Sequence, residues 1–174
     1  MVRYTTGDIF KSPAQVITNP VNCVGVMGGG LALEFKKRYA DLFGDYVERC
    51  KKNLVKPGQP YLFETADTQI LNFPTKRHWK DVSLIEDIES GLKFLAENYA
   101  EMGIFYLALP ALGCGLGGLE WSDVKHLIDK HLGPVADLEV MVFEPAETGI
   151  KSGKRSTESR TPKSGSGVAA GPEL

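Results

Sequence analysis

The chain has 174 residues, of which 43% are hydrophobic and 24% are charged, and its formal net charge is −2. This composition gives one ordinary domain enough apolar surface for a core, which excludes a disordered or fibrous protein for most of the length. A slightly acidic chain has no global positive field that would attract nucleic acid, so any such contact must be local.

The cysteines and histidines indicate where the protein works. Three cysteines and three histidines occur without the spacing of a metal site, so we expect no bound metal and no cofactor. The sequence has neither a signal peptide nor an apolar run of about 18 residues. We therefore expect a reduced, cytoplasmic protein that makes no membrane contact.

The first 18 residues contain two β-type runs. Val2–Thr5 predicts a strand that ends at Gly7. Asp8 then stands where it would cap a short helical turn, because aspartate accepts hydrogen bonds from the first free amides of a helix. Val16–Thr18 is apolar and β-branched, which predicts a buried central strand.

The stretch Asn19–Phe35 is the most informative part of the sequence. An apolar run leads into the three glycines at 28–30, and an amphipathic helix follows. Consecutive glycines let the backbone approach a ligand closely, and the amides at a helix N-terminus favour an anion. The stretch therefore predicts a phosphate cradle, with a flexible surface turn as the alternative. The paired amides Asn19 and Asn22 favour the cradle.

A helical stripe follows the glycines from Ala32 to Cys50, and Gly44 is a position where this helix would bend or divide. Two β-like runs come next, at 61–64 and 69–73. They lead into an aromatic and basic loop at 72–81, which combines lysine, arginine, histidine and tryptophan. The simplest interpretation of this loop is an exposed charged surface.

The next helix is expected to begin near Ser83, because Glu86 three residues later completes a capping box. A strand at 105–109 then leads into a second glycine-rich stretch, Pro110–Trp121. Its glycines at 113, 115 and 118 also satisfy the spacing of a dinucleotide-binding Rossmann fingerprint. We favour a second phosphate loop, because the fingerprint normally opens a fold whereas this stretch lies near its end.

The chain ends with a helix capped by Ser122 and a strand at 138–143. Strands and helices alternate throughout, which predicts an α/β fold with a mixed or parallel sheet covered on both faces. Beyond residue 146 the composition changes to glycine, serine, lysine and proline, which bury little apolar surface. We expect one domain at 1–146 and a flexible linker or tail at 147–174.

Three short motifs in this order resemble the signatures of a macrodomain, the ADP-ribose-binding α/β module. They are Gly7-Asp8-Ile9, the pair Asn19 and Asn22 before the triple glycine, and the run from Pro110 to Gly117. The resemblance covers about residues 1 to 145. It implies a three-layer α/β/α fold with a mixed central sheet and a cleft for ADP-ribose between the two glycine loops.

The resemblance also assigns ligand contacts. It implies that Asp8 accepts a hydrogen bond from the adenine amino group and that Asn22 contacts the distal ribose. For Asn22 the alternative is that the side chain only braces its own turn. Phe143 offers a stacking face for the adenine, although an aromatic residue at a strand end is often plain core. The complete expected set of ligand contacts is Asp8, Ile9, Asn22, Gly28, Gly29, Gly30, Leu31, Pro74, Thr75, Gly113, Cys114, Gly115, Leu116, Gly117, Gly118 and Phe143.

Within macrodomains, the chain is most similar to the branch of the terminal ADP-ribose protein glycohydrolase and the bacterial DarG antitoxins. This branch places a lysine just ahead of the third helix, and Lys80 aligns there as the catalytic candidate beside Asn22. A partly desolvated lysine near other cations can supply a neutral amine for attack, or it can stay charged and assist the leaving base. His78 is a further acid–base candidate.

The chain departs from the protein-directed enzyme in one respect. That enzyme pairs its lysine with an aspartate in the second glycine loop, where this chain has Gly117 or Gly118. The departure fits the DarG subgroup, which implies a glycohydrolase that removes ADP-ribose from modified, single-stranded DNA and opposes an ADP-ribosyltransferase toxin. The alternatives are a non-catalytic ADP-ribose reader and a hydrolase of protein-linked or small-molecule ADP-ribose.

Overall fold

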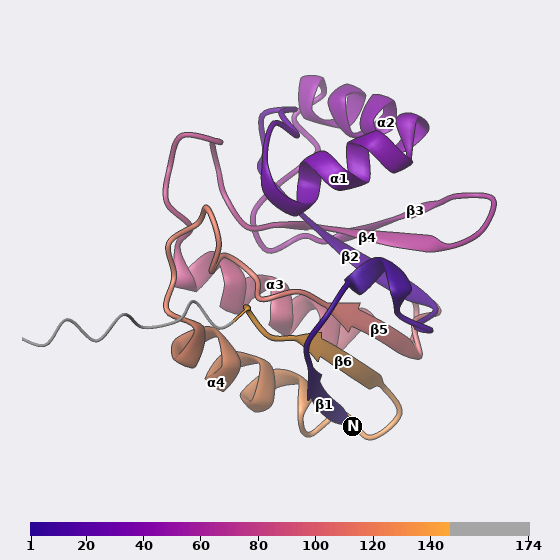
Figure 1. The fold of residues 1–174 in the computed structure, drawn as a ribbon, viewed down its shortest axis with the longest axis vertical. Coiled ribbons are helices and arrows are strands. Elements are labelled where there is room, and N and C mark those ends of the chain that lie inside the picture. The colour runs from indigo at the N-terminus through magenta and orange to yellow at the C-terminus, as the bar shows by residue number, and fades with distance from the viewer. Residues whose placement is uncertain (147–174) are drawn as a thin grey trace, which may run out of the picture.

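The computed structural model describes residues 1–146, and the predicted tail at 147–174 lies outside the described residues. A short 3₁₀ helix at Ile9–Lys11 follows the first strand. The other elements, shown in Figure 1, are β1 (Val2–Thr5), β2 (Val16–Val21), α1 (Gly30–Arg38), α2 (Ala40–Lys51), β3 (Tyr61–Glu64), β4 (Gln69–Pro74), α3 (Ile85–Asn98), β5 (Tyr106–Leu109), α4 (Trp121–Leu132) and β6 (Glu139–Phe143).

The strands form a six-stranded mixed sheet in the order β1-β6-β5-β2-β4-β3. Strand β3 is antiparallel to β4, and every other neighbouring pair is parallel. The mixed sheet that the sequence predicts is therefore confirmed. The strand order differs from the 3-2-1-4-5-6 order of a Rossmann fold, so the dinucleotide fingerprint in the second glycine stretch is coincidental.

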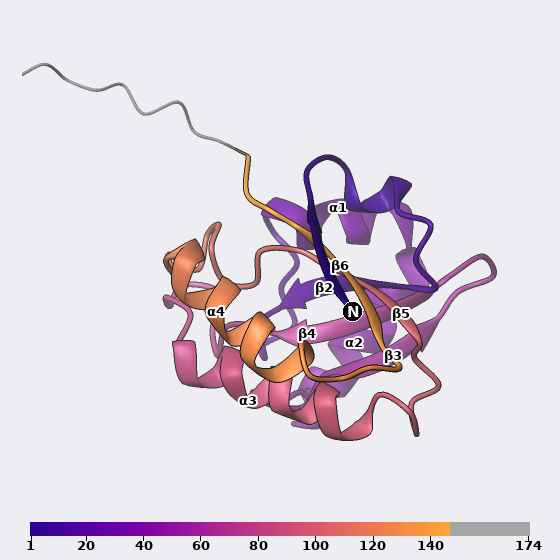
Figure 2. The same ribbon diagram turned by 90° about the horizontal axis from the view of Figure 1, so that it is seen from below.

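Side chains alternate between the two faces of the sheet and build two cores. Val16 and Leu107 belong to the core under α3 and α4, whereas their neighbours Ile17 and Ala108 belong to the core under α1 and α2. This alternation follows from the two-residue period of a strand. Figures 1 and 2 show the resulting layers, with the first helix pair on one face and the second pair on the other.

The first helical stripe divides, but not at the glycine that the sequence indicates. Tyr39 separates α1 from α2 and has φ −133° and ψ 83°, which is not helical. Gly44 lies inside α2, where an added Cβ would meet no atom within 4 Å beyond the helix itself. An interior glycine costs a helix only about 1 kcal/mol, which the buried Leu42 and Tyr46 offset through tertiary packing.

The two predicted helix caps differ from the structure. Leu84 is the N-cap of α3, and Ser83 makes no capping bond; its amide instead donates to the carbonyl of Gly117 at 2.9 Å. Glu120 is the N-cap of α4, which places Ser122 inside the first turn. Ser83 is thus used to hold the second glycine loop. Among residues 1–146, every helix is too short or too polar to cross a membrane.

Two glycines in helices should respond to alanine in opposite directions. In α3, a Cβ at Gly91 would overlap the ring of the fully buried Phe73. We expect Gly91→Ala to lower the free energy of unfolding by about 1–3 kcal/mol through overpacking. Gly44→Ala in α2 should raise it by up to about 1 kcal/mol, because alanine is the better helix former. Urea unfolding measures both changes, and equal signs would contradict the packing of α3 on β4.

Candidate active site

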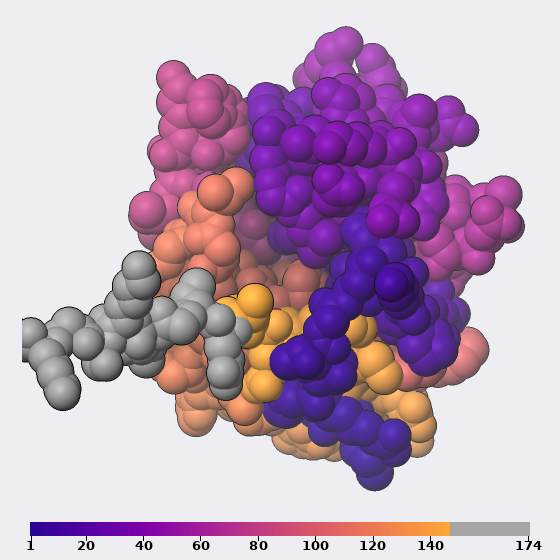
Figure 3. Space-filling model, viewed as in Figure 1, coloured from indigo at the N-terminus to yellow at the C-terminus, as the bar shows by residue number. Residues whose placement is uncertain are grey.

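A cleft of about 950 Å³ lies at the carboxyl ends of the five parallel strands. Figure 3 shows it as a hollow between helix α1 and the loop after β5. The cleft runs across four strand spacings, from β1 to β4, and at about 4.8 Å each these give the cleft a length of about 19 Å. Its size is typical of ligand sites, and it is lined by Gly7, Asp8, Ile9, Pro20, Val21, Asn22, Val26, Gly28, Gly29, Gly30, Leu31, Ala32, Thr75, Lys76, Trp79, Pro110, Ala111, Gly113, Cys114, Gly115, Leu116, Gly117, Phe143, Glu144 and Pro145.

The first glycine loop presents the N-terminus of α1 to the cleft. Gly29 is the N-cap of this helix and makes no side-chain capping bond, and the first turn holds no acidic residue. The first amides of α1 therefore keep their hydrogens for a ligand, and the helix dipole adds a partial positive charge. The centre of the cleft is therefore suited to an anion.

The second glycine loop adds amides from the opposite wall. Within the described residues, no backbone bond engages the amides of residues 115–117, whereas the amides of Cys114 and Gly118 donate within the loop. Gly118, which the resemblance assigned as a ligand contact, lies outside the lining. At Gly117 a Cβ would collide with Ser83 Oγ and Gly113 O, so this close packing requires glycine.

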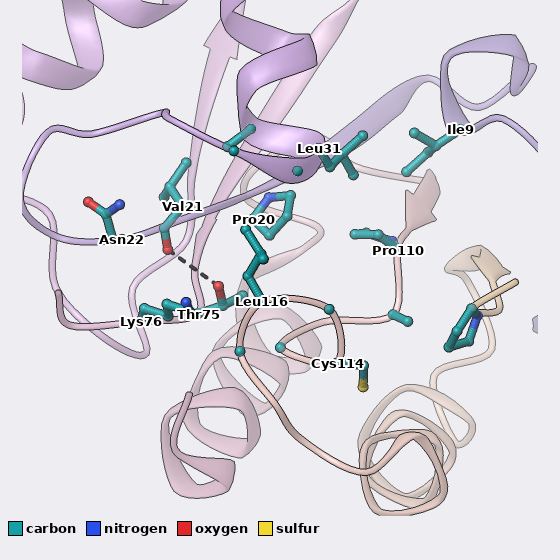
Figure 4. A pocket seen from close by; sticks show the side chains of 18 of the residues that line it. Ile9, Pro20, Val21, Asn22, Leu31, Thr75, Lys76, Pro110, Cys114 and Leu116 are labelled. Atoms are coloured by element: carbon teal, nitrogen blue, oxygen red, sulfur yellow. Dashed lines mark hydrogen bonds between the residues drawn. The ribbon is translucent and has the colours of Figure 1, made fainter. Parts of the chain in front are cut away.

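The two glycine loops approach each other across the cleft. Leu116 is 73% exposed at the tip of the second loop. Its Cδ1 atom lies 3.2 Å from the position that a Cβ would take at Gly29. Figure 4 shows Leu116 extending from its loop into the cleft. A ligand between the loops would be held from both sides.

Asp8, which follows β1, and Phe143, which ends β6, both line the cleft at the end formed by these two strands. Asp8 Oδ1 accepts from the amide of Phe10 at 2.9 Å, which confirms the predicted cap. The same carboxylate has a second oxygen for a ligand. Glu144, which the sequence analysis missed, also lines this end and pairs with Lys125 at 3.0 Å.

Asn22 is held rigidly where the first loop begins. Its Oδ1 accepts from the hydroxyl of Tyr46 at 2.7 Å and from the amide of Val24 at 3.0 Å, while Nδ2 donates to the carbonyl of Val26 at 2.7 Å. Burial raises the pKa of Tyr46, so the hydroxyl stays a donor. Asn22 thus braces its own loop, and the second hydrogen of Nδ2 is available to a ligand in the cleft.

The loop after β4 forms the other end of the cleft. Thr75, Lys76 and Trp79 line it, while Lys80 is exposed and lies outside the lining. Lys80 Nζ lies 5.0 Å from the ring centroid of Trp79. Pro74, the last residue of β4, is buried and also lies outside the lining. The sequence indicates this basic loop, but no local pattern in it shows that Lys76 and Trp79 face the cleft.

Two kinds of chemistry receive no support at the cleft. Burial raises the pKa of the Cys114 thiol to about 11, so at neutral pH it is not a thiolate nucleophile. Among residues 1–146, no three histidine, cysteine or acidic side chains gather as metal ligands would. The remaining polar groups at the cleft include Asn22, the amides of the glycine loops, the lysines of the loop after β4, and the carboxylates of Asp8 and Glu144.

The sheet order, the three layers and the paired glycine loops define an α/β module built for a phosphate-containing ligand. The chain belongs to the Macro domain family, whose model matches residues 18–128.

Several proteins within that family are similar to this chain in sequence and structure. The chain is 39% identical to the DNA ADP-ribosyl glycohydrolase of Thermus aquaticus, covering 84% of this chain and 42% of that protein. Among solved structures, the macrodomain of Mycobacterium tuberculosis DarG matches with a TM-score of 0.81, 37% identity and coverage of 84% and 99%. Thermosipho africanus DarTG in complex with ADP-ribose matches with a TM-score of 0.81, 43% identity and coverage of 86% and 43%. The chain spans less than half the length of the curated relatives that it matches most strongly.

The bond between Tyr46 and Asn22 can be tested without a ligand. Tyr46→Phe removes the donor from two buried acceptors, the side-chain and main-chain oxygens of Asn22. We expect it to lower the free energy of unfolding by about 1–3 kcal/mol. Asn22→Ala combined with Tyr46→Phe should cost less than the sum of the single changes, with a coupling of about 0.5–3 kcal/mol in a urea double-mutant cycle. Strict additivity would show that the two side chains do not interact.

Proposed function

We propose that the cleft binds ADP-ribose in an extended form across the strand ends. Three observations support this proposal: the uncapped N-terminus of α1, the free amides of residues 115–117 and the length of the cleft. The diphosphate lies between the two glycine loops, and the adenine lies between Asp8 and Phe143. The distal ribose then lies at Asn22 and Thr75, at the β4 end.

The proposed activity is that of a glycohydrolase that removes ADP-ribose from a modified base in DNA. The observation that carries it is the likeness over 84% of this chain to relatives named DNA ADP-ribosyl glycohydrolase. Residues 1–146 form the proposed catalytic domain, since a macrodomain of DarG matches over 99% of its own length. The proposed substrate is single-stranded, because a base inside a duplex would have to be flipped out of the stack at a cost in pairing and stacking energy.

The proposed partner is a DNA ADP-ribosyltransferase toxin. A relative from Thermosipho africanus is named as a fusion of a DNA ADP-ribosyl transferase with a DNA ADP-ribosyl glycohydrolase. Such a fusion joins the two opposing activities in one polypeptide. In the proposal, this chain acts as the antitoxin that reverses the transferase reaction.

Lys80 is the proposed catalytic residue. Hydrolysis breaks the bond between the anomeric carbon of the distal ribose and the base nitrogen, the base takes up a proton, and water supplies the hydroxyl of the product. Lys80 acts either as a nucleophile that holds the ribose until water releases it, or as a cation that assists the leaving base. Its loop carries it at the β4 end, so a rotation of its long, exposed side chain brings Nζ toward the ribose.

Adding a side chain to the first glycine loop should block ADP-ribose. Gly29 has an extended backbone, with φ −160°, that accepts any residue. Gly29→Val should therefore fold, yet its methyl groups occupy the space between the two loops. We expect calorimetry to show at least a tenfold loss of ADP-ribose affinity. Gly44→Val is the control, because a Cβ at Gly44 would meet no atom within 4 Å and the residue lies outside the cleft. Undiminished affinity in Gly29→Val would contradict the placement of the diphosphate.

Lysine variants separate chemistry from binding. Lys80→Ala should lower kcat on ADP-ribosylated single-stranded DNA by about 10²–10⁴-fold and leave the Kd of free ADP-ribose nearly unchanged. Lys76→Ala, which removes a cation that lines the cleft, should instead raise the Kd of free ADP-ribose. Borohydride trapping of the wild-type protein, but not of Lys80→Ala, would identify Lys80 as the nucleophile. If Lys76→Ala loses turnover and Lys80→Ala keeps it, the catalytic role belongs to Lys76. If the wild-type protein binds ADP-ribose but shows no turnover, the protein is a reader and not an enzyme.

A further inference from the structure

A pair of aromatic rings stands on the loop after β4. His78 stacks on Trp79 with ring centroids 5.7 Å apart and 27° between the ring planes. Trp79 lines the cleft and is still 49% exposed. A large exposed aromatic side chain at the mouth of a cleft has no folding role that requires its exposure. We call His78 and Trp79 the ring platform.

The main chain and one ion pair fix the base of this loop. Arg77 donates two hydrogen bonds to Asp87, at 3.0 and 3.1 Å, and Asp87 is only 7% exposed in helix α3. The carbonyl of Arg77 also accepts from the amide of Cys23. Arg77 is therefore committed to the fold. The loop holds the ring platform in place before any ligand arrives, which lowers the entropic cost of binding.

The charge around the ring platform favours a polyanion. The tail carries five basic and three acidic residues, which leaves −4 on residues 1–146 of a chain whose net charge is −2. On this acidic domain, Lys76 and Lys80 flank the two rings. Aromatic rings between cations are the usual surface for single-stranded nucleic acid, since every base has a flat face and every linkage a negative charge.

The ring platform lies at the end of the cleft where the substrate would continue. Asp8 and Phe143 belong to the β1 and β6 end, whereas Trp79 follows β4 at the opposite end. With the adenine at Asp8, whatever is attached to the distal ribose leaves the cleft beside Trp79. This step rests on the proposed function.

We propose that Trp79, supported by His78, stacks the nucleobase next to the modified one in a single strand. Lys80 Nζ now lies near the Trp79 ring, and an exposed cation–π contact of this kind is weaker than base stacking on tryptophan. A base can therefore take the place of the cation, which frees Lys80 to turn toward the ribose. The ring platform thus selects modified DNA over a modified single nucleoside.

The test compares two substrates that share the scissile bond. One is an ADP-ribosylated single-stranded oligonucleotide, and the other is the corresponding ADP-ribosylated nucleoside. Trp79→Ala should lower the ratio of kcat/KM for the oligonucleotide to that for the nucleoside by about 5- to 100-fold, mainly through KM. Trp79→Phe should keep most of the ratio. Phe105→Ala, which removes another exposed aromatic residue (64%) from outside the cleft, is the control and should leave the ratio unchanged.

Several outcomes would overturn the ring platform. If Trp79→Ala cleaves both substrates as fast as the wild-type protein, the stacking role is rejected. If the variant loses equally on both substrates, so that the ratio stays unchanged, Trp79 belongs to the ADP-ribose site instead. Cleavage of an ADP-ribosylated peptide but not of the oligonucleotide would identify a protein occupant. If the wild-type protein cleaves neither substrate, the proposed activity fails. The stacking role is then tested by calorimetry, as the ratio of the Kd values of the oligonucleotide and the nucleoside. The Trp79→Ala defect should also persist at high salt, because stacking is not screened as phosphate contacts are.

Discussion

Five strands that run in one direction end at one edge of the sheet, and the cleft depends on this alignment. Each strand delivers a different piece of the site to that edge: Asp8 after β1, Asn22 after β2, Thr75 after β4, the second glycine loop after β5 and Phe143 at the end of β6. Strand β3 runs the other way and contributes no lining residue. Segments far apart in the sequence thereby lie side by side along a cleft that is long enough for a ligand.

Backbone amides, rather than charged side chains, make the centre of this line suitable for an anion. The structural requirement is therefore for glycine where two chains nearly touch. Gly117 fits against Ser83 and Gly113 with no room for a Cβ. Ser83 donates its amide to Gly117 and so holds the loop from beneath. The Ser83 hydroxyl does not cap helix α3, whose N-cap is Leu84, and within the described residues it has no hydrogen-bond partner.

Rigid anchors on each side of the β4 end leave a few groups free for chemistry. Tyr46 holds Asn22 from the core, and the buried Asp87 holds Arg77 at the base of the basic loop. Lys80 is tied down by neither anchor, and its side chain is exposed. This arrangement is compatible with the proposed division of labour, in which preorganised groups bind the ligand and the exposed Lys80 takes part in the chemistry.

Local patterns in the sequence were enough to predict the strands, the cap at Asp8 and both glycine loops, whereas the other expected cleft contacts came from the resemblance to macrodomains. These features depend on periods of two to four residues and on the special backbone of glycine. Tertiary structure alone decided that Tyr39 rather than Gly44 divides the first helices, that Ser83 serves a loop, that Tyr46 holds Asn22, and that Lys76 and Trp79 face the cleft. Each of these outcomes depends on contacts between distant segments, whose packing and hydrogen bonds outweigh weak local preferences.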